Sequence, residues 1–345
     1  MSGQLQTVTG PVPQGELGTI LCHEHLFNDL TGVVDAPSFD FSKVLAGRLV
    51  RPDLQWALRQ DPYCCADNMG SKAVDDVVSE VQSFAALGGR TIVDATGSSS
   101  IGRSPEKLLA VAERTGLNIV MSTGPYLEKF EGERITARTV DAQASDIDDD
   151  LNRGVGHTGI RAGMIGEVGV SPSFTEAERG ALRAAAIAQT GNPGVALNIH
   201  MPGWQRRGHE VLDVVLDECG VKPVKVSLAH ADPSGADPDY QMSLLDRGVW
   251  LEFDMIGLDI TFPGEGVSPS VSETVAAVKG LIDRGYGPQL LLSSDLFLKQ
   301  MWTKNGGNGF AFVPTVFIEL LQAQGVAATD ARALVTVNPA AALAG

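Results

Sequence analysis

Two histidines, His23 and His25, are separated by one residue at the end of an apolar segment that reads GTILCHEH. Side chains two residues apart in a β-strand point to the same face, so both imidazoles could reach one metal ion. Imidazole is a common ligand of zinc and related divalent ions. Because buried histidines often only satisfy a hydrogen bond, this pair alone fits an ordinary core position as well.

Four further candidates each stand among the last three residues of their own short apolar segment: Glu167, His200, His230 and Asp295. Together with His23 and His25 they offer four imidazoles and two carboxylates, more than one tetrahedral ion needs. This set predicts two metal ions that share a bridging carboxylate.

Glu167 is the predicted bridge, because it is the acid of its segment and Gly166 and Gly169 leave room for close approach. A carbamylated lysine could also bridge two metals, but the chain has no lysine between Lys129 and Lys222. The alternative for Glu167 is a buried carboxylate that pairs with Arg161 or another neighbour. A dication is the stronger partner for a buried charge.

Asp295 ends the segment LLLSSD, and we expect two roles for it. Its carboxylate could bind a metal ion, and it could accept and donate the proton of a metal-activated water. Asp254 ends another such segment, where it is either a substrate contact or a carboxylate of the wall.

The elements that carry these residues alternate regularly along the chain. Eight apolar, β-branched segments predict strands over 18–25, 91–96, 118–123, 160–168, 195–200, 224–230, 250–256 and 289–295. Helical periodicity follows each one, over 72–87, 105–115, 134–152, 175–189, 207–219, 237–247, 272–284 and 313–324. Eight such units favour a (β/α)8 TIM barrel, whose sites lie where the strands end. A doubly wound open sheet is the alternative, but the chain lacks G-x-G-x-x-G and P-loop motifs.

We expect residues 1–345 to form a single barrel domain with one long insertion after the first strand. Residues 26–71 are too long for a plain loop and contain Pro37, Pro52 and Pro62, so we interpret them as a lid over the barrel mouth. A closing helical segment over 329–344 should be interrupted at Pro339.

Composition excludes several classes of function. The formal charge of −16 disfavours binding to nucleic acid or to an anionic membrane surface. The sequence has no apolar run near the ~20 residues of a membrane span and no leader at its N-terminus, which predicts a cytoplasmic protein. The four cysteines have no C-x-x-C spacing and should be reduced thiols.

Six separated motifs resemble those of the phosphotriesterase family of the amidohydrolase superfamily, specifically the phosphotriesterase-related proteins. They are GPVPQGELGTILCHEHL, TGIRAGMIGEVG, LNIH, LAHAD, LLSSD and NGGNGF, and they span about Thr7 to Ala342. The resemblance implies a barrel with a binuclear centre. It places His23, His25 and Asp295 on one ion and His200 and His230 on the other, with Glu167 and a hydroxide between them.

One difference between this chain and other family members concerns the substrate. Organophosphate-hydrolysing members and many lactonases bridge their metals with a carbamylated lysine, whereas this chain resembles the branch that uses glutamate. We therefore expect attack on a carbonyl centre, in a lactone, carboxylic ester or amide. Organophosphate triester hydrolysis is the alternative, and a catalytically inactive barrel that binds a ligand or a partner protein is the alternative of another class.

Residues in the loops after the predicted strands could contact the substrate. The resemblance places Tyr126 near the substrate, as in lactonase-like members. Arg206, Lys299 and Trp302 follow predicted strands, so cations could reach an anionic tail on a small-molecule substrate; solvent-facing side chains are the alternative. The metal is expected to be Zn²⁺, with Mn²⁺, Co²⁺ and Fe²⁺ as alternatives. A homodimer is expected by analogy with related barrels.

Overall fold

The computed structural model describes residues 3–345, and its centre is an eight-stranded parallel sheet whose strands neighbour one another in chain order. The strands are β3 (Thr19–Glu24), β4 (Gly89–Asp94), β5 (Asn118–Thr123), β6 (Met164–Gly169), β7 (Ala196–His200), β8 (Val226–Leu228), β9 (Trp250–Phe253) and β12 (Leu290–Leu292). The last strand returns to the first, because the backbone N–H of Asp295 donates to the carbonyl oxygen of His23 over 3.2 Å. The predicted (β/α)8 barrel is confirmed.

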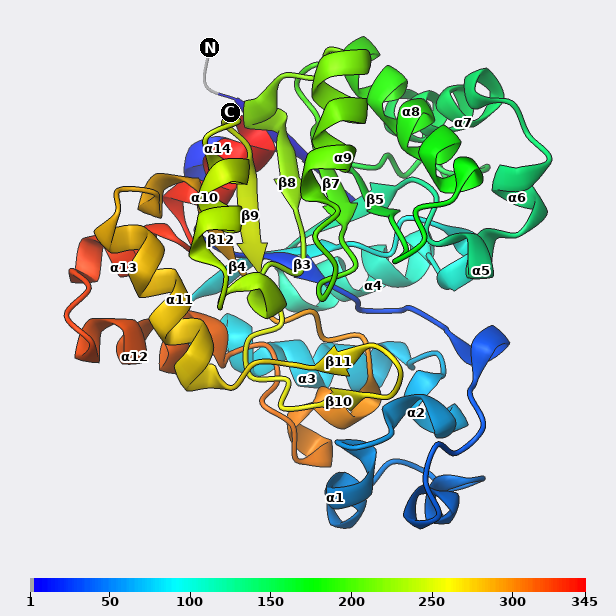
Figure 1. Ribbon diagram of the computed structural model, residues 1–345. Coiled ribbons are helices and arrows are strands. Elements are labelled where there is room, and N and C mark those ends of the chain that lie inside the picture. Colours follow the sequence, from blue (N-terminus) through cyan, green and yellow to red (C-terminus); the bar gives the residue numbers. More distant parts are fainter. Residues whose placement is uncertain (1–2) are drawn as a thin grey trace.

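Helices follow every strand, as the periodicity predicts (Figure 1). The main ones are α3 (Val74–Ala86), α4 (Pro105–Thr115), α7 (Val140–Asn152), α8 (Glu176–Gly191), α9 (Gly208–Leu212), α10 (Pro238–Leu245), α11 (Val271–Asp283) and α12 (Ile318–Ala323). Local sequence sets their ends. Pro105 opens α4 and Gly116 follows it in the left-handed conformation, and Thr175 and Glu178 form a capping box on α8.

The C-terminal segment departs from the prediction. It forms α13 (Ala328–Ala333) and α14 (Val337–Ala344), and the break lies before Val337 rather than at Pro339. Pro339 is in the first turn of α14, where a proline does not remove a helical hydrogen bond. In Figure 1, the C-terminus lies at the end of α14.

Two apolar clusters hold the barrel together. The larger one packs the helices onto the outer faces of the strands. The smaller one includes Ile20, Cys22, Val93 and Met164 of the strands together with side chains of α14. Burial of these side chains supplies the main stabilisation of the fold.

Residues 26–71 run along one side of the barrel as short helices, among them α1 (Gln55–Leu58) and α2 (Ala66–Met69). The hairpin of β10 (Thr261–Phe262) and β11 (Gly266–Val267) lies beside them in the lower part of Figure 1. The segment has a small core of its own around Leu45 and Leu58.

Within residues 3–345, the helices are all too short or too polar to cross a membrane.

Candidate functional site

Six polar side chains converge at the end of the barrel where the strands finish. His23 lies in β3 and His25 directly after it, while Glu167 lies in β6 and His200 ends β7. His230 follows β8 by two residues, and Asp295 follows β12 by three. All are buried except His200, which is partly exposed, so the structure brings together all six residues of the predicted ligand set.

The carboxylate of Glu167 is the point where the four histidines meet. Its Oε1 lies 3.1 Å from Nε2 of His25, and its Oε2 lies 3.4 Å from Nε2 of His23. Oε2 also lies 3.0 Å from Nδ1 of His200 and 3.3 Å from Nε2 of His230. Glu167 makes no contact with Arg161, which instead donates to Gln6 on the surface. The alternative of an ordinary ion pair with Arg161 is therefore wrong.

The ring nitrogens divide into two groups around this carboxylate. On one side, His25 Nε2 lies 3.3 Å and His23 Nε2 lies 3.9 Å from Asp295 Oδ1. On the other side, His200 Nδ1 and His230 Nε2 are 2.8 Å apart. Within residues 3–345, His23 Nε2 is a buried nitrogen that has no hydrogen-bond partner.

The opposite nitrogens of three histidines are held by hydrogen-bond partners. Nδ1 of His25 lies 2.9 Å from the hydroxyl of Thr96, and Nδ1 of His23 lies 3.2 Å from Glu252. Asp254 lies 2.9 Å from Nδ1 of His230. An N–H donated to each of these oxygens leaves Nε2 deprotonated and aimed at the centre, which is the tautomer that a metal ion needs.

The electrostatics of the site keep the central carboxylate ionised. Burial would raise the pKa of Glu167, but His200 and His23 hold that pKa well below its ordinary value. Burial lowers the pKa of His200, and the neighbouring His230 contributes to this shift. Burial would lower the pKa of His25, but Asp295 and Glu167 raise it to about 9. Ionised Glu167 and neutral His200 are in the protonation states in which a carboxylate and an imidazole bind metals.

Backbone geometry fixes the strand ends. A side chain at Gly166 would put its Cβ 2.5 Å from the carbonyl oxygen of Asn198, so only glycine allows β6 to approach β7 this closely beside Glu167. His230 and Asp295 both have positive φ angles, 59° and 48°, which is unusual for residues with side chains. The turn at Asp295 is held by Glu24, which accepts the backbone N–H groups of Ser294 and Leu296.

These residues fit a pair of divalent metal ions. Ligand-type atoms of His23, His25 and Glu167 lie within 4.8 Å of one another, and so do those of Glu167, His200 and His230. The nitrogen and oxygen donors suit zinc and related ions. Asp254 groups with His23 and His230 in the same way, but through the Nδ1 atoms that point away from the centre. We therefore interpret Asp254 as a partner that orients the imidazoles.

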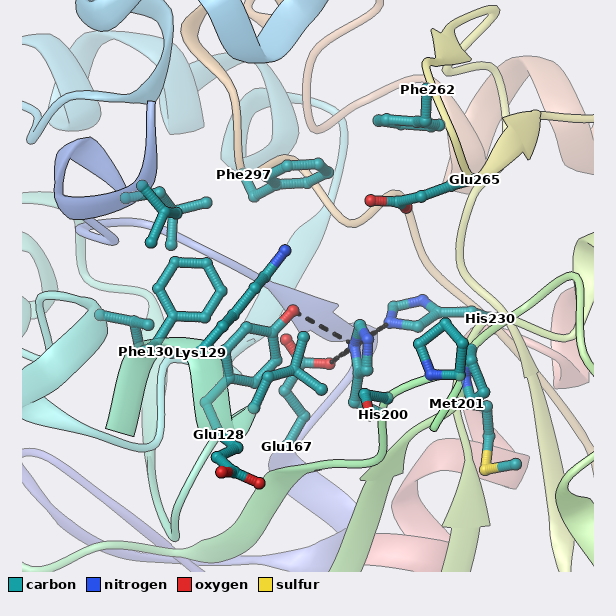
Figure 2. Close-up of a pocket in the computed structure, with 18 of the residues that line it drawn as sticks. Glu128, Lys129, Phe130, Glu167, His200, Met201, His230, Phe262, Glu265 and Phe297 are labelled. Carbon is teal, nitrogen blue, oxygen red and sulfur yellow. Dashed lines mark hydrogen bonds and ion pairs between the residues drawn. The ribbon is translucent and has the colours of Figure 1, made fainter. Parts of the chain in front are cut away.

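The site opens into a cavity of about 850 Å³ (Figure 2). Tyr126 lines it, and its hydroxyl lies 3.3 Å from His200 Nδ1. Residues 26–71 contribute one wall through Asn28, Leu30, Val33, Asp35, Tyr63 and Met69. Phe130 of α5 (Glu128–Glu131), Phe262 and Phe297 also line the cavity, and α5 contacts Thr31–Val33 of the same wall.

Four residues that the sequence placed near the substrate do not line this cavity: Asp254, Arg206, Lys299 and Trp302. Arg206 pairs with Asp237 and stacks over Tyr240, and Lys299 pairs with Asp67 over 2.7 Å. Trp302 is buried in the core, with 1% of its surface exposed. A residue that follows a strand is expected near the mouth of the barrel. These side chains instead point toward neighbouring elements of the fold.

Six charged residues that line the cavity were not anticipated from the sequence: Asp35, Glu128, Lys129, Glu133, Glu178 and Glu265. Lys129 extends from α5 into the cavity, and Glu265, between β10 and β11, lies above His230 (Figure 2). Glu252 and Thr96, which orient two of the histidines, were also missed. The alternation of strand β9 puts Glu252 on the same face as Asp254, and this signal could have found Glu252.

The family model described as "Phosphotriesterase family" matches residues 3–343 of this chain. A phosphotriesterase-related protein of Nematostella vectensis is 30% identical, over 98% of this chain and 97% of its own length. An N-acetyltaurine hydrolase of Xenopus tropicalis is 28% identical, also over 98% of this chain and 97% of its own length.

Two solved structures share the fold. A resiniferatoxin-binding protein from Rhodobacter sphaeroides superposes with a TM-score of 0.95 at 40% identity, over 99% of this chain and 95% of that one. A phosphotriesterase homology protein from Escherichia coli superposes with a TM-score of 0.76 at 24% identity, over 94% of this chain and 98% of that one.

Proposed function

Because the chain belongs to the phosphotriesterase family, whose hydrolases depend on divalent metals, we propose that it hydrolyses a carbonyl substrate at a binuclear metal centre. One observation carries the proposal: the carboxylate of Glu167 lies within 3.4 Å of ring nitrogens from all four strand-end histidines. Burying this many polar side chains together costs free energy unless cations bind between them.

His23, His25 and Asp295 would hold one ion, His200 and His230 the other, and Glu167 would bridge them. When bound, such ions lower the pKa of water toward neutrality and polarise a carbonyl group. Zn²⁺ is the ion we expect, with Mn²⁺, Co²⁺ and Fe²⁺ as alternatives.

The chain's own residues supply orientation and proton transfer. Asp295 would accept the proton of the attacking water and donate it to the leaving group, because its carboxylate lies 3.3 Å from His25 and also lines the cavity. The Tyr126 hydroxyl, beside His200, would donate a hydrogen bond to the substrate. Residues 26–71, which form one wall of the cavity, would limit the access of water as a lid.

Among carbonyl substrates, amides have the strongest support. Relatives that match nearly the whole chain are named N-acetyltaurine hydrolase, and this name describes amide cleavage. Lactones and carboxylic esters share the carbonyl centre. The glutamate bridge resembles the branch of the family that does not rely on a carbamylated lysine, which disfavours organophosphate triesters.

The test is a panel of substrates assayed with metal-supplemented and metal-depleted protein. The panel contains an N-acylated amine, a γ-lactone, a carboxylic ester and an aryl dialkyl phosphate. We expect metal-dependent cleavage of carbonyl substrates, the amide first, with the phosphate triester cleaved at least about 100-fold more slowly. Faster cleavage of the phosphate triester would support the organophosphate alternative, and metal binding without turnover of the panel would support an inactive ligand-binding barrel.

A further inference from the structure

Four aromatic side chains gather in one part of the cavity. They come from four separate segments of the chain, and all of them line the cavity: Tyr63, Trp204, Phe262 and Phe297. Phe262 is at their centre, with its ring centroid 5.5 Å from that of Tyr63 and 5.9 Å from that of Trp204. It also stacks on Phe297 at 6.4 Å. Phe262 is buried, whereas the other three are partly exposed. We call these four residues the Phe262 cluster.

Contacts between distant segments hold the cluster in place. The backbone N–H of Thr261 donates to the carbonyl oxygen of Arg59 over 2.7 Å, which ties β10 to the segment after β3. Nε1 of Trp204 donates to the carbonyl oxygen of Val267 over 3.3 Å. A Cβ at Gly266 would lie 2.2 Å from this indole nitrogen, so only glycine lets Trp204 pack on the hairpin. The rings therefore form a preformed surface, and a ligand that covers them loses little binding energy to ordering.

The cluster begins beside one half of the candidate metal centre. Phe297 follows Asp295 by two residues, and its ring lies edge-on to that of His25, with centroids 6.4 Å apart. Asp295 lies 3.3 Å from Nε2 of the same histidine. Asp295 is the proton donor to the leaving group in the proposed function, so the leaving group would lie on the side of Phe297. Tyr126, in contrast, lies beside His200.

The charge and size of this part of the cavity also bear on the leaving group. Glu265 follows Phe262 by three residues and lines the cavity, and Figure 2 shows it on the same side of the histidines as Phe262 and Phe297. A carboxylate there repels an anionic leaving group. The cavity of about 850 Å³ is in the range that holds drug-sized ligands, so it has room for a group much larger than a small amine.

We propose that the Phe262 cluster binds an aromatic ring in the leaving-group half of the substrate. The inference rests on the proposed function, because it assigns a substrate class to the same site: amides and esters whose amine or alcohol half carries an aryl group. Covering the partly exposed rings removes apolar surface from water, which favours binding. This class differs from N-acetyltaurine, whose leaving group is small and anionic.

The test compares four amides with the metal-loaded protein. N-(2-phenylethyl)acetamide carries the ring in its leaving group, and 3-phenyl-N-propylpropanamide carries it in the acyl half. N-propylacetamide has no ring, and N-acetyltaurine has an anionic leaving group. The readout is kcat/KM where a probe is cleaved and Kd from calorimetry where it is not. We expect N-(2-phenylethyl)acetamide to exceed each of the other three probes by about tenfold or more.

Variants then assign this preference, defined as the ratio between N-(2-phenylethyl)acetamide and N-propylacetamide. Phe297→Ala and Tyr63→Ala should each lower the ratio several-fold, whereas Tyr63→Phe keeps the ring and should keep the ratio. Because Phe262 is buried, Phe262→Leu replaces it without opening a large cavity, and it should also lower the ratio. Phe41→Ala is the matched control, since Phe41 stacks on Phe39 at the surface and does not line the cavity. Elemental analysis of each variant checks that metal binding is intact.

Equal values for N-(2-phenylethyl)acetamide and N-propylacetamide would overturn the proposal. A ratio that survives both Phe297→Ala and Tyr63→Ala would overturn it as well, and so would a gain from the ring in the acyl half alone. These outcomes differ from failure of the proposed function. Cleavage of carbonyl substrates without the aryl preference would reject the subsite alone. Tighter binding of the aryl probe that depends on the Phe262 cluster, without cleavage of the panel, would reject hydrolysis alone.

Discussion

The Nδ1 atom of His230 lies 2.9 Å from Oδ1 of Asp254, and the same carboxylate accepts the backbone N–H of His230. This double contact holds a residue with a positive φ angle and turns its Nε2 atom toward Glu167. Burial would raise the pKa of Asp254, but His230 and His23 lower it, so the carboxylate is ionised. Asp254 thus sets the orientation and tautomer of a candidate metal ligand.

Replacing this carboxylate should weaken metal binding without unfolding the protein. We expect Asp254→Asn to lower metal affinity by about 10- to 100-fold, because the amide cannot stabilise the donating Nδ1–H as a carboxylate does. Metal retained at graded chelator concentrations measures this. Asp217→Asn is the control, since Asp217 pairs with Arg247 at the surface. Equal retention in both variants would show that Asp254 does not orient a ligand.

Glu167→Ala tests the bridge itself. Because Glu167 contacts both groups of histidines, its loss should reduce bound metal from two ions per chain toward one or none. Elemental analysis of protein dialysed against metal-free buffer gives the count, and Glu210→Ala serves as a surface control. Two ions retained by Glu167→Ala would place the bridge at another residue.

Asp295→Asn separates proton transfer from metal binding. The amide keeps an oxygen that can bind a metal, but it cannot accept a proton, so we expect kcat to fall about 10²- to 10⁴-fold while much of the metal remains. Steady-state kinetics on the best amide of the panel, together with elemental analysis, distinguishes the two roles. A kcat near that of the unmodified protein would remove Asp295 from the chemistry.

The alternation of strands and helices predicted the barrel, and strand-end position predicted the six ligand-type residues. Both patterns can be recognised within a few residues of sequence. A buried parallel strand is a run of apolar residues, and the residues of a barrel's site stand where such runs end. The two-residue spacing of His23 and His25 is the clearest example. Even so, a register shift in the β3–β4 ladder between Leu21 and Glu24 shows that strict alternation does not hold throughout.

The side chains that line the cavity could not be predicted from the sequence in the same way. Lys299 follows Asp295 by four residues, yet it pairs with Asp67, which lies 232 residues away in the chain. Lys129 contributes to the cavity because the short helix α5 docks on the start of α8 through Glu128. The direction in which each of these side chains points depends on contacts with residues far away in the chain. The type of a residue and its position after a strand do not predict that direction.

A buried lysine behind the site offers a test of how the cavity wall is positioned. Lys72 is 3% exposed, and burial lowers its pKa to about 7. Its Nζ donates to the side chain of Asn28 and, over 2.8 Å, to the carbonyl oxygen of Phe297. Lys72 therefore joins the segment after β3 to the turn after Asp295, and both Asn28 and Phe297 line the cavity.

We expect Lys72→Met to lower the free energy of unfolding by about 1–3 kcal/mol, because buried oxygens lose their donor. KM should rise as well, because the positions of Asn28 and Phe297 would no longer be fixed, whereas bound metal should change little. Urea unfolding, kinetics and elemental analysis measure the three effects. Lys43→Met, which breaks a surface pair with Asp40, should change stability by less than about 0.5 kcal/mol. If Lys72→Met unfolded like the control and kept its KM, Lys72 would not position the wall.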